Sequence, residues 1–149
     1  MSRKSTSRKP AKWPISPLLG SLMQAGEASS PNPHLLRSLL ALDALHRGKG
    51  TTHLLTLLAQ QLLVSEELCL AGYQRAQLGA VQEAHAALVK LDREVPGNDG
   101  LKAAGAEYEA LRIALVVYDA QLRSATRTQV RDAQLATARR LSGCLDRPD

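Results

Sequence analysis

The chain has 149 residues, enough for one domain with a buried core, and its 44% hydrophobic content is typical of a folded protein. Two cysteines are too few for a disulfide scaffold, and the lack of any run of ~20 apolar residues predicts no membrane-spanning helix. The net charge of +5 lies in residues 1–12, and the rest of the chain is neutral, with 14 basic and 14 acidic side chains.

Leucine and alanine dominate the apolar content, whereas aromatic residues account for 3% and Phe is absent. Both are strong helix formers, and a core made of them packs as closely spaced helices. We therefore expect an all-α fold. It is predicted as an antiparallel bundle of about four helices with a long C-terminal helix and a disordered basic N-terminal arm, in a soluble, cytoplasmic protein.

The first 33 residues differ in composition from the rest. Residues 1–12 are rich in Ser, Arg and Lys, so we expect a disordered tail. Its basic side chains suit contacts with phosphates, although a solubilising terminus is the simpler interpretation; they are Arg3, Lys4, Arg8, Lys9 and Lys12. Residues 13–33 combine four prolines with apolar side chains, which predicts an arm that docks on the body or on a partner. The candidate docking residues are Trp13, Ile15, Leu18 and Leu19.

Three helices are predicted next along the chain. The first covers residues 34–47, where leucines recur at helical spacing and Gly48 suits the position after the last turn. The second covers residues 52–71, is rich in leucine, and ends or kinks at Gly72. The third covers residues 73–94, and its alanines favour close approach to a neighbouring helix.

The sequence "VPGNDG" at residues 95–100 is the strongest break, and Asp99 is the expected N-cap of a fourth segment that is helical from 100 to 142 and stops at Gly143. That segment would be about 65 Å long. It must bend back near "RSAT", pair with two helices in series, or project from the bundle domain, residues 34–145. We favour a projecting C-terminal half that pairs with a second copy, so a homodimer is one hypothesis.

The segment "HRGKGTT" resembles part of a phosphate-binding loop. A P-loop requires G-x-x-x-x-G-K-[ST] after a strand. Here Asp43 stands at the position of the first glycine, Gly50 stands where Ser or Thr is required, and the preceding element is a predicted helix. We interpret the segment as a helix-to-helix turn in which the hydroxyl of Thr51 or Thr52 caps the next helix.

The titratable residues form no recognisable catalytic or metal-binding pattern. The four histidines lack metal-ligand spacing, and the paired carboxylates of Glu66–Glu67 and of Glu107 and Glu109 do not share a helical face. We therefore expect a protein that is not an enzyme, with no catalytic residue, cofactor or metal.

Three arginines in "RSATRTQVR" stand four residues apart: Arg123, Arg127 and Arg131. In one continuous helix they line one side, where acidic residues are sparse. Such a row suits phosphate or an acidic partner, although a solvated face is the simpler interpretation. Together with the basic tail, it makes nucleic-acid binding an alternative.

Two phrases carry a resemblance to a family. "LDALHRGKGT" and "LVVYDAQLRSAT" resemble motifs of a loose group of short, helical, uncharacterised proteins of phages and integrative elements in proteobacteria. The matching residues of the first phrase are Arg47, Gly48, Gly50 and Thr51. Those of the second are Asp119, Ala120, Gln121, Leu122, Ala125 and Thr126. The resemblance implies a mobile element and an accessory or regulatory role.

These features favour a non-enzymatic helical module that acts by binding a protein, with the apolar arm as a docking segment and the final helix as a pairing surface. The alternative is a nucleic-acid-associated regulator that places the basic arm and the arginine row on phosphates. A second alternative is an inhibitor of a host defence system. We expect no membrane partner.

Overall fold

The computed structural model describes residues 32–94 and 100–146, with side chains described as far as residue 143. The predicted all-α class is confirmed, because the elements of this part of the chain are helical and the only extended pairing in it is an isolated bridge between Gly50 and Leu101. The elements are α2 (Pro33–His46), α3 (Thr52–Leu70), the 3-10 helix η1 (Arg75–Gln77), α4 (Leu78–Glu94), α5 (Gly105–Ser124) and α6 (Arg127–Asp146).

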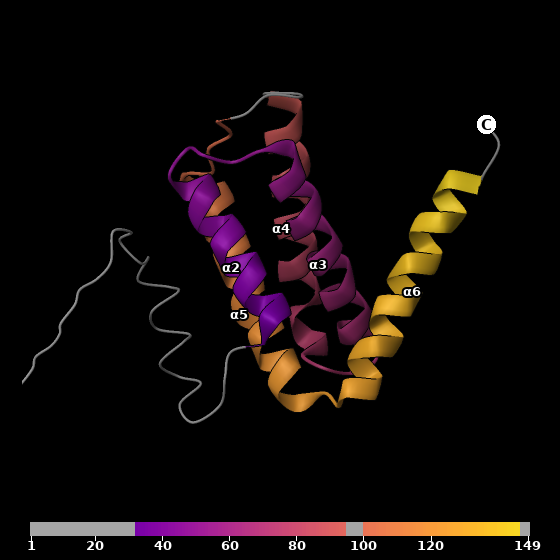
Figure 1. The fold of residues 1–149 in the computed structure, drawn as a ribbon. Helices are drawn as coiled ribbons and strands as arrows, with labels where there is room; N and C mark the ends of the chain where they lie inside the picture. The colour runs from indigo at the N-terminus through magenta and orange to yellow at the C-terminus, as the bar shows by residue number, and fades with distance from the viewer. Residues whose placement is uncertain (1–31, 95–99, 147–149) are drawn as a thin grey trace, which may run out of the picture.

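Helices α2, α3, α4 and α5 lie side by side, and each runs back along the one before it (Figure 1). Helix α5 packs between α2 and α4, and α3 also contacts both of them. Helix α6 starts at the end of the bundle where α5 stops, contacts α3, and diverges from the bundle towards its own C-terminal end (Figure 1). Among the described helices, none is both long and apolar enough to span a membrane.

Leucine side chains fill the space between the four packed helices, as the composition predicts. Burial of one leucine side chain contributes about 1.5–3 kcal/mol, so this cluster is the main stabilising feature of the fold. The side chains that are at most 2% exposed include Leu39, Leu42, Leu45, Leu58, Leu62, Leu68, Leu101, Leu111, Leu115 and Tyr118.

The first two helices begin and end as predicted. The Asn32 side chain caps α2 by accepting from the His34 N–H at 2.9 Å, and the Thr51 hydroxyl caps α3 by accepting from the Leu54 N–H at 3.2 Å. Gly48 follows α2 with φ of +74°, a conformation that glycine adopts without steric cost. The turn interpretation of residues 46–52 is therefore confirmed.

The predicted start of the third helix at residue 73 was wrong. Gly72, with φ of +110°, ends α3, and the Tyr73 N–H donates back to the Leu68 carbonyl at 2.9 Å in a Schellman arrangement. Gln74 then adopts φ of +58°, so the chain turns before η1 and α4. The left-handed conformations of Gly72 and Gln74 keep these two residues out of a helix, and η1 then leads into α4 at residue 78.

The fourth predicted segment, from 100 to 142, was wrong at its start. The Leu101 carbonyl accepts from the Gly50 N–H at 2.9 Å, and the Ala103 N–H donates to the Leu45 carbonyl at 2.9 Å. These bonds hold the backbone outside the helix, so α5 begins at Gly105. The predicted N-cap Asp99 lies outside the described residues.

The prediction for this segment was wrong in two further respects: it is not one continuous helix, and it does not stop at Gly143. Two helices occupy it, with the break at residues 125 and 126, so the chain bends back near "RSAT" and α6 contacts α3. The projecting C-terminal half that we favoured was therefore wrong. Gly143 does not stop the last helix, which continues to Asp146. A glycine in an exposed helix costs about 1 kcal/mol relative to alanine, which is insufficient to end it.

Candidate functional site

Two groups of predicted contact residues lie outside the described residues. They are the basic tail, with Arg3, Lys4, Arg8, Lys9 and Lys12, and the apolar arm, with Trp13, Ile15, Leu18 and Leu19. The candidate surface is therefore built from the helices alone.

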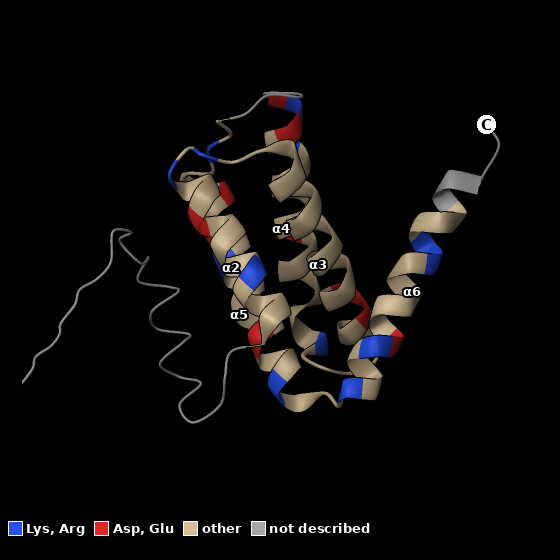
Figure 2. Ribbon diagram, viewed as in Figure 1, with Lys and Arg blue, Asp and Glu red and all other residues tan. Residues whose placement is uncertain are grey.

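The row of three arginines is divided between two helices. Arg123 belongs to the last turn of α5 and forms an ion pair with Asp119 at 3.1 Å, whereas Arg127 and Arg131 belong to α6 and are exposed. All three stay near the junction of the two helices, where Figure 2 shows basic residues at one end of the molecule. The single line of arginines expected from the spacing is not formed.

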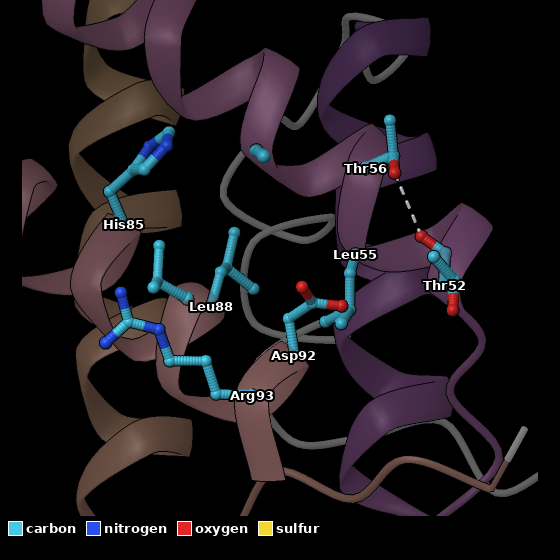
Figure 3. A pocket seen from close by; sticks show the side chains of 9 residues that line it. Thr52, Leu55, Thr56, His85, Leu88, Asp92 and Arg93 are labelled. Carbon is cyan, nitrogen blue, oxygen red and sulfur yellow. Dashed lines mark hydrogen bonds between the residues drawn. The ribbon is translucent and has the colours of Figure 1, made fainter. Parts of the chain in front are cut away.

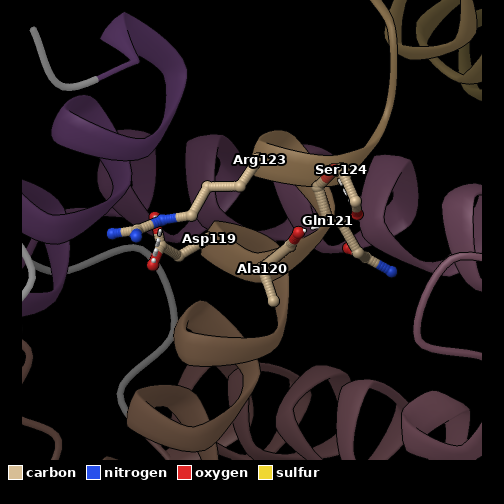
Figure 4. Close-up of polar contacts among 5 residues, drawn as sticks. All are labelled: Asp119, Ala120, Gln121, Arg123 and Ser124. Carbon is tan, nitrogen blue, oxygen red and sulfur yellow. Dashed lines mark hydrogen bonds and ion pairs between the residues drawn. The ribbon is translucent and has the colours of Figure 1, made fainter. Parts of the chain in front are cut away.

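Local hydrogen bonds create the break between α5 and α6. The Ser124 hydroxyl donates to the Ala120 carbonyl at 2.9 Å in the last turn of α5 (Figure 4), and the extended Ala125 follows it. Thr126 and Gln129 then form a capping box: the Thr126 N–H donates to Gln129 Oε1 at 2.8 Å, and the Gln129 N–H donates to Thr126 Oγ1 at 3.1 Å. The pattern T-x-x-Q at residues 126–129 is a capping-box signal. It was missed because it lies in a stretch that also fits a continuous helix.

Gln121 is fully buried within α5 and binds α3 and the turn that follows it. Its side-chain oxygen accepts from Ser65 Oγ at 2.6 Å. Its amide nitrogen lies 3.0 Å from the carbonyls of Ser65 and Tyr73 and 3.2 Å from Cys69 Sγ. Burial raises the pKa of the Cys69 thiol, so that side chain is a neutral member of a structural network.

Few side chains attach α6 to the body. Ala133 and Thr137 are its buried residues, and Gln134 approaches the His34 ring at 3.4 Å. The Arg140 guanidinium bridges Glu66 at 3.1 Å and Glu67 at 2.8 Å. These adjacent carboxylates, which showed no catalytic pattern in the sequence, therefore both pair with the Arg140 guanidinium and hold α6 against α3.

The side of α6 that points away from α3 combines apolar and basic side chains. Leu135 is 47% exposed, and Arg131 and Arg139 stand four residues before and after it, on the same side of the helix. Ala138 is exposed beside them. We call Arg131, Leu135, Ala138 and Arg139 the outer face of α6. In the described structure, neither of these arginines forms an ion pair or side-chain hydrogen bond.

A groove of about 290 Å³ lies between α3 and α4 (Figure 3). Leu55 and Leu88 form its apolar part, and Thr52, Asp92 and Arg93 its polar part. The groove is open to solvent and is also lined by His85, whose Nδ1 is buried without a hydrogen-bond partner among the described residues.

A ring contact joins α2 to α5. The His46 ring lies over Tyr108, with centroids 4.2 Å apart, which joins the end of α2 to the start of α5. Within residues 32–94 and 100–146, no cluster of three or more His, Cys, Asp or Glu side chains is arranged to hold a metal ion. No protein-family model, curated protein or solved structure matches this chain.

Proposed function

We propose that the protein is a non-enzymatic helical module that binds another protein through the outer face of α6. The observation that carries this proposal is the half-exposed Leu135 between Arg131 and Arg139. A leucine that is accessible on a helix supplies an apolar anchor, and arginines beside it form ion pairs at the edge of an interface. The partner is therefore expected to present an apolar pocket with acidic residues around it.

Helix α6 suits this role because, among the described residues, its buried side chains lie on its inner side. Ala133 and Thr137 use one stripe of the helix for contact with α3, and the outer face lies on the opposite side. The apolar arm, residues 13–33, supplies a second docking segment in this proposal. A mobile-element context and an accessory role follow from the resemblance of the two motifs and belong to the same proposal.

Site-specific photo-cross-linking tests the protein-binding proposal. A photoreactive residue at Leu135 should capture a partner protein, whereas the same residue at Val89, which is 42% exposed on α4, should not. Reversing the charges with Arg131→Glu and Arg139→Glu should abolish the capture. Equal products from positions 135 and 89, or none from position 135, would argue against the proposal. Deletion of residues 1–31, which keeps the Asn32 cap and the start of α2 at Pro33, tests the contribution of the arm.

The second candidate is a regulator that binds nucleic acid. Arg127 and Arg131, exposed beside the α5–α6 junction, favour it together with the five basic residues of the tail. A gel-shift titration should then show affinity that falls with salt and falls further when both arginines become alanine. Arg123→Ala is the matched control, because Arg123 is paired with Asp119. No shift at low salt would eliminate this candidate.

A further inference from the structure

We propose that α6 is exchanged between two copies of the chain. In the exchanged form, residues 124–127 become helical, α5 and α6 join into one straight helix, and α6 packs on the α3 of a second copy. This inference goes beyond the proposed function, because it concerns how the chain associates with itself and does not depend on another partner.

The break between α5 and α6 has a composition that also suits a continuous helix. The residues from Ser124 to Arg127 include neither glycine nor proline, and alanine at position 125 is the strongest helix former. Ala125 is nevertheless extended, with φ of −84° and ψ of 148°. The capping box of Thr126 and Gln129 supports this break, so the folded-back and straight forms differ mainly in local hydrogen bonds.

The contacts of α6 can be formed in either arrangement. The described contacts of α6 link it to α3 and, through Gln134, to His34 at the start of α2. A second copy presents the same residues, including the Glu66–Glu67 pair that binds Arg140. A connection of residues 125 and 126 is short, and short hinges favour exchange of an element between copies.

The directions of the helices fit a two-fold symmetric dimer. Helix α6 runs back along the bundle in the direction opposite to α3 and α5 (Figure 1). If α5 and α6 become one helix of about 63 Å, α6 extends beyond the end of the bundle. A two-fold axis perpendicular to that helix places the α6 of the second copy on the α3 of the first. The two helices are then antiparallel, as α6 and α3 are within the single chain. In this form Arg123, Arg127 and Arg131 would line one side, as their spacing predicts.

Position 127 gives a variant that separates the two forms. Arg127 is the first residue of α6, where proline is well tolerated, whereas proline inside a continuous helix removes a hydrogen bond and disrupts it. Arg127→Pro should therefore remain a single chain at every concentration in light scattering. The wild type and the matched control Arg127→Ala should change from one chain to two as concentration rises. The double variant Thr126→Ala/Gln129→Ala should dimerise at several-fold lower concentration, because it lacks the capping box.

Cross-linking distinguishes exchange of α6 from other dimers. His34→Cys and Gln134→Cys, introduced on separate chains in a Cys144→Ser background, should be joined by a short bismaleimide only when α6 of one chain lies on the other. Circular dichroism of Arg127→Pro checks that it folds. Cross-linking between the chains and a concentration-dependent dimer that Arg127→Pro lacks would support the proposal. A wild type that stays a single chain at its highest concentration, or equal dimerisation of Arg127→Pro and Arg127→Ala, would overturn it.

Discussion

Ser65 on α3 and Gln121 on α5 form two hydrogen bonds across the core: Ser65 Oγ donates to Gln121 Oε1 at 2.6 Å, and Gln121 Nε2 donates to the Ser65 carbonyl at 3.0 Å. Both residues are 0% exposed. Gln121 also reaches the Tyr73 carbonyl, so one side chain connects α5 to α3 and to the turn before α4. This network fixes the end of α5 from which α6 departs.

Removal of the Gln121 amide should destabilise the protein strongly. Gln121→Leu leaves Ser65 Oγ and the Tyr73 carbonyl buried without their partner, and an unsatisfied buried polar group costs about 1–3 kcal/mol. We expect the free energy of unfolding in urea to fall by about 2–4 kcal/mol. Gln82→Leu, at an exposed position of α4, is the control and should change stability by less than about 0.5 kcal/mol. Equal effects at the two positions would show that the network contributes no stability.

Gly50 should be intolerant of a side chain. A Cβ atom there would lie 2.8 Å from the Leu101 carbonyl oxygen and would also clash with the Leu45 side chain. Gly50→Ala is therefore expected to lower the free energy of unfolding by about 1–3 kcal/mol. Gly79→Ala is the control, because no atom lies within 4 Å of its added Cβ and alanine favours the helix. Thermal unfolding of both variants measures the difference; a tolerated Gly50→Ala would mean that the bridge to Leu101 is absent.

The stability of the fold should fall at high pH through Tyr118. Burial raises the pKa of its phenol, so the folded state keeps a proton that the unfolded state loses. This stabilisation is fully present below about pH 10, the usual pKa of tyrosine in an unfolded chain. As the pH rises further, towards the pKa of Tyr118 in the folded state, the free energy of unfolding falls by up to about 1.4 kcal/mol per pH unit. Urea unfolding above pH 10 should show a shallower decline for Tyr118→Phe. Parallel curves for the variant and the wild type would contradict this assignment.

At neutral pH the same substitution tests a single hydrogen bond. The Tyr118 hydroxyl donates to Gln61 Oε1 at 2.7 Å. Tyr118→Phe should therefore lower the free energy of unfolding in urea by about 1 kcal/mol at pH 7.

The sequence predicted the helices best where local signals agree. Thr51 and Gly48 fix the ends of α3 and α2 through bonds to nearby backbone, so short motifs were sufficient. The break before α6 was missed because the capping box lies in a stretch that also suits a helix interior. Gln121 was named only as a motif residue, and its role in the core was missed because its bonds reach residues 48 to 56 positions away, which periodicity does not reveal.

Arg140 should control how firmly α6 is attached. The side chains of this ion-pair cluster are partly exposed, so its contribution to global stability is expected to be below about 1 kcal/mol. Locally, Arg140→Ala should raise the rate of backbone amide hydrogen exchange in α6 several-fold and leave the rate in α5 unchanged. The matched control is Arg139→Ala, which removes the neighbouring exposed arginine of the outer face. Equal exchange in the two variants would mean that Glu66 and Glu67 do not hold α6.

In the single chain, α6 is a separate helix that folds back on α3. Spin labels at Gln60→Cys and Ala138→Cys, in a Cys144→Ser background, test it by electron–electron double resonance. The sample should be dilute enough to remain a single chain in light scattering, so that distances within one folded-back chain are measured. Helix α6 lies beside α3 and Ala138 faces away from it, so we predict a distance of about two helix diameters, roughly 20–24 Å, between the labels. A distance longer by tens of ångströms, as a straight α5–α6 helix requires, would contradict the claim.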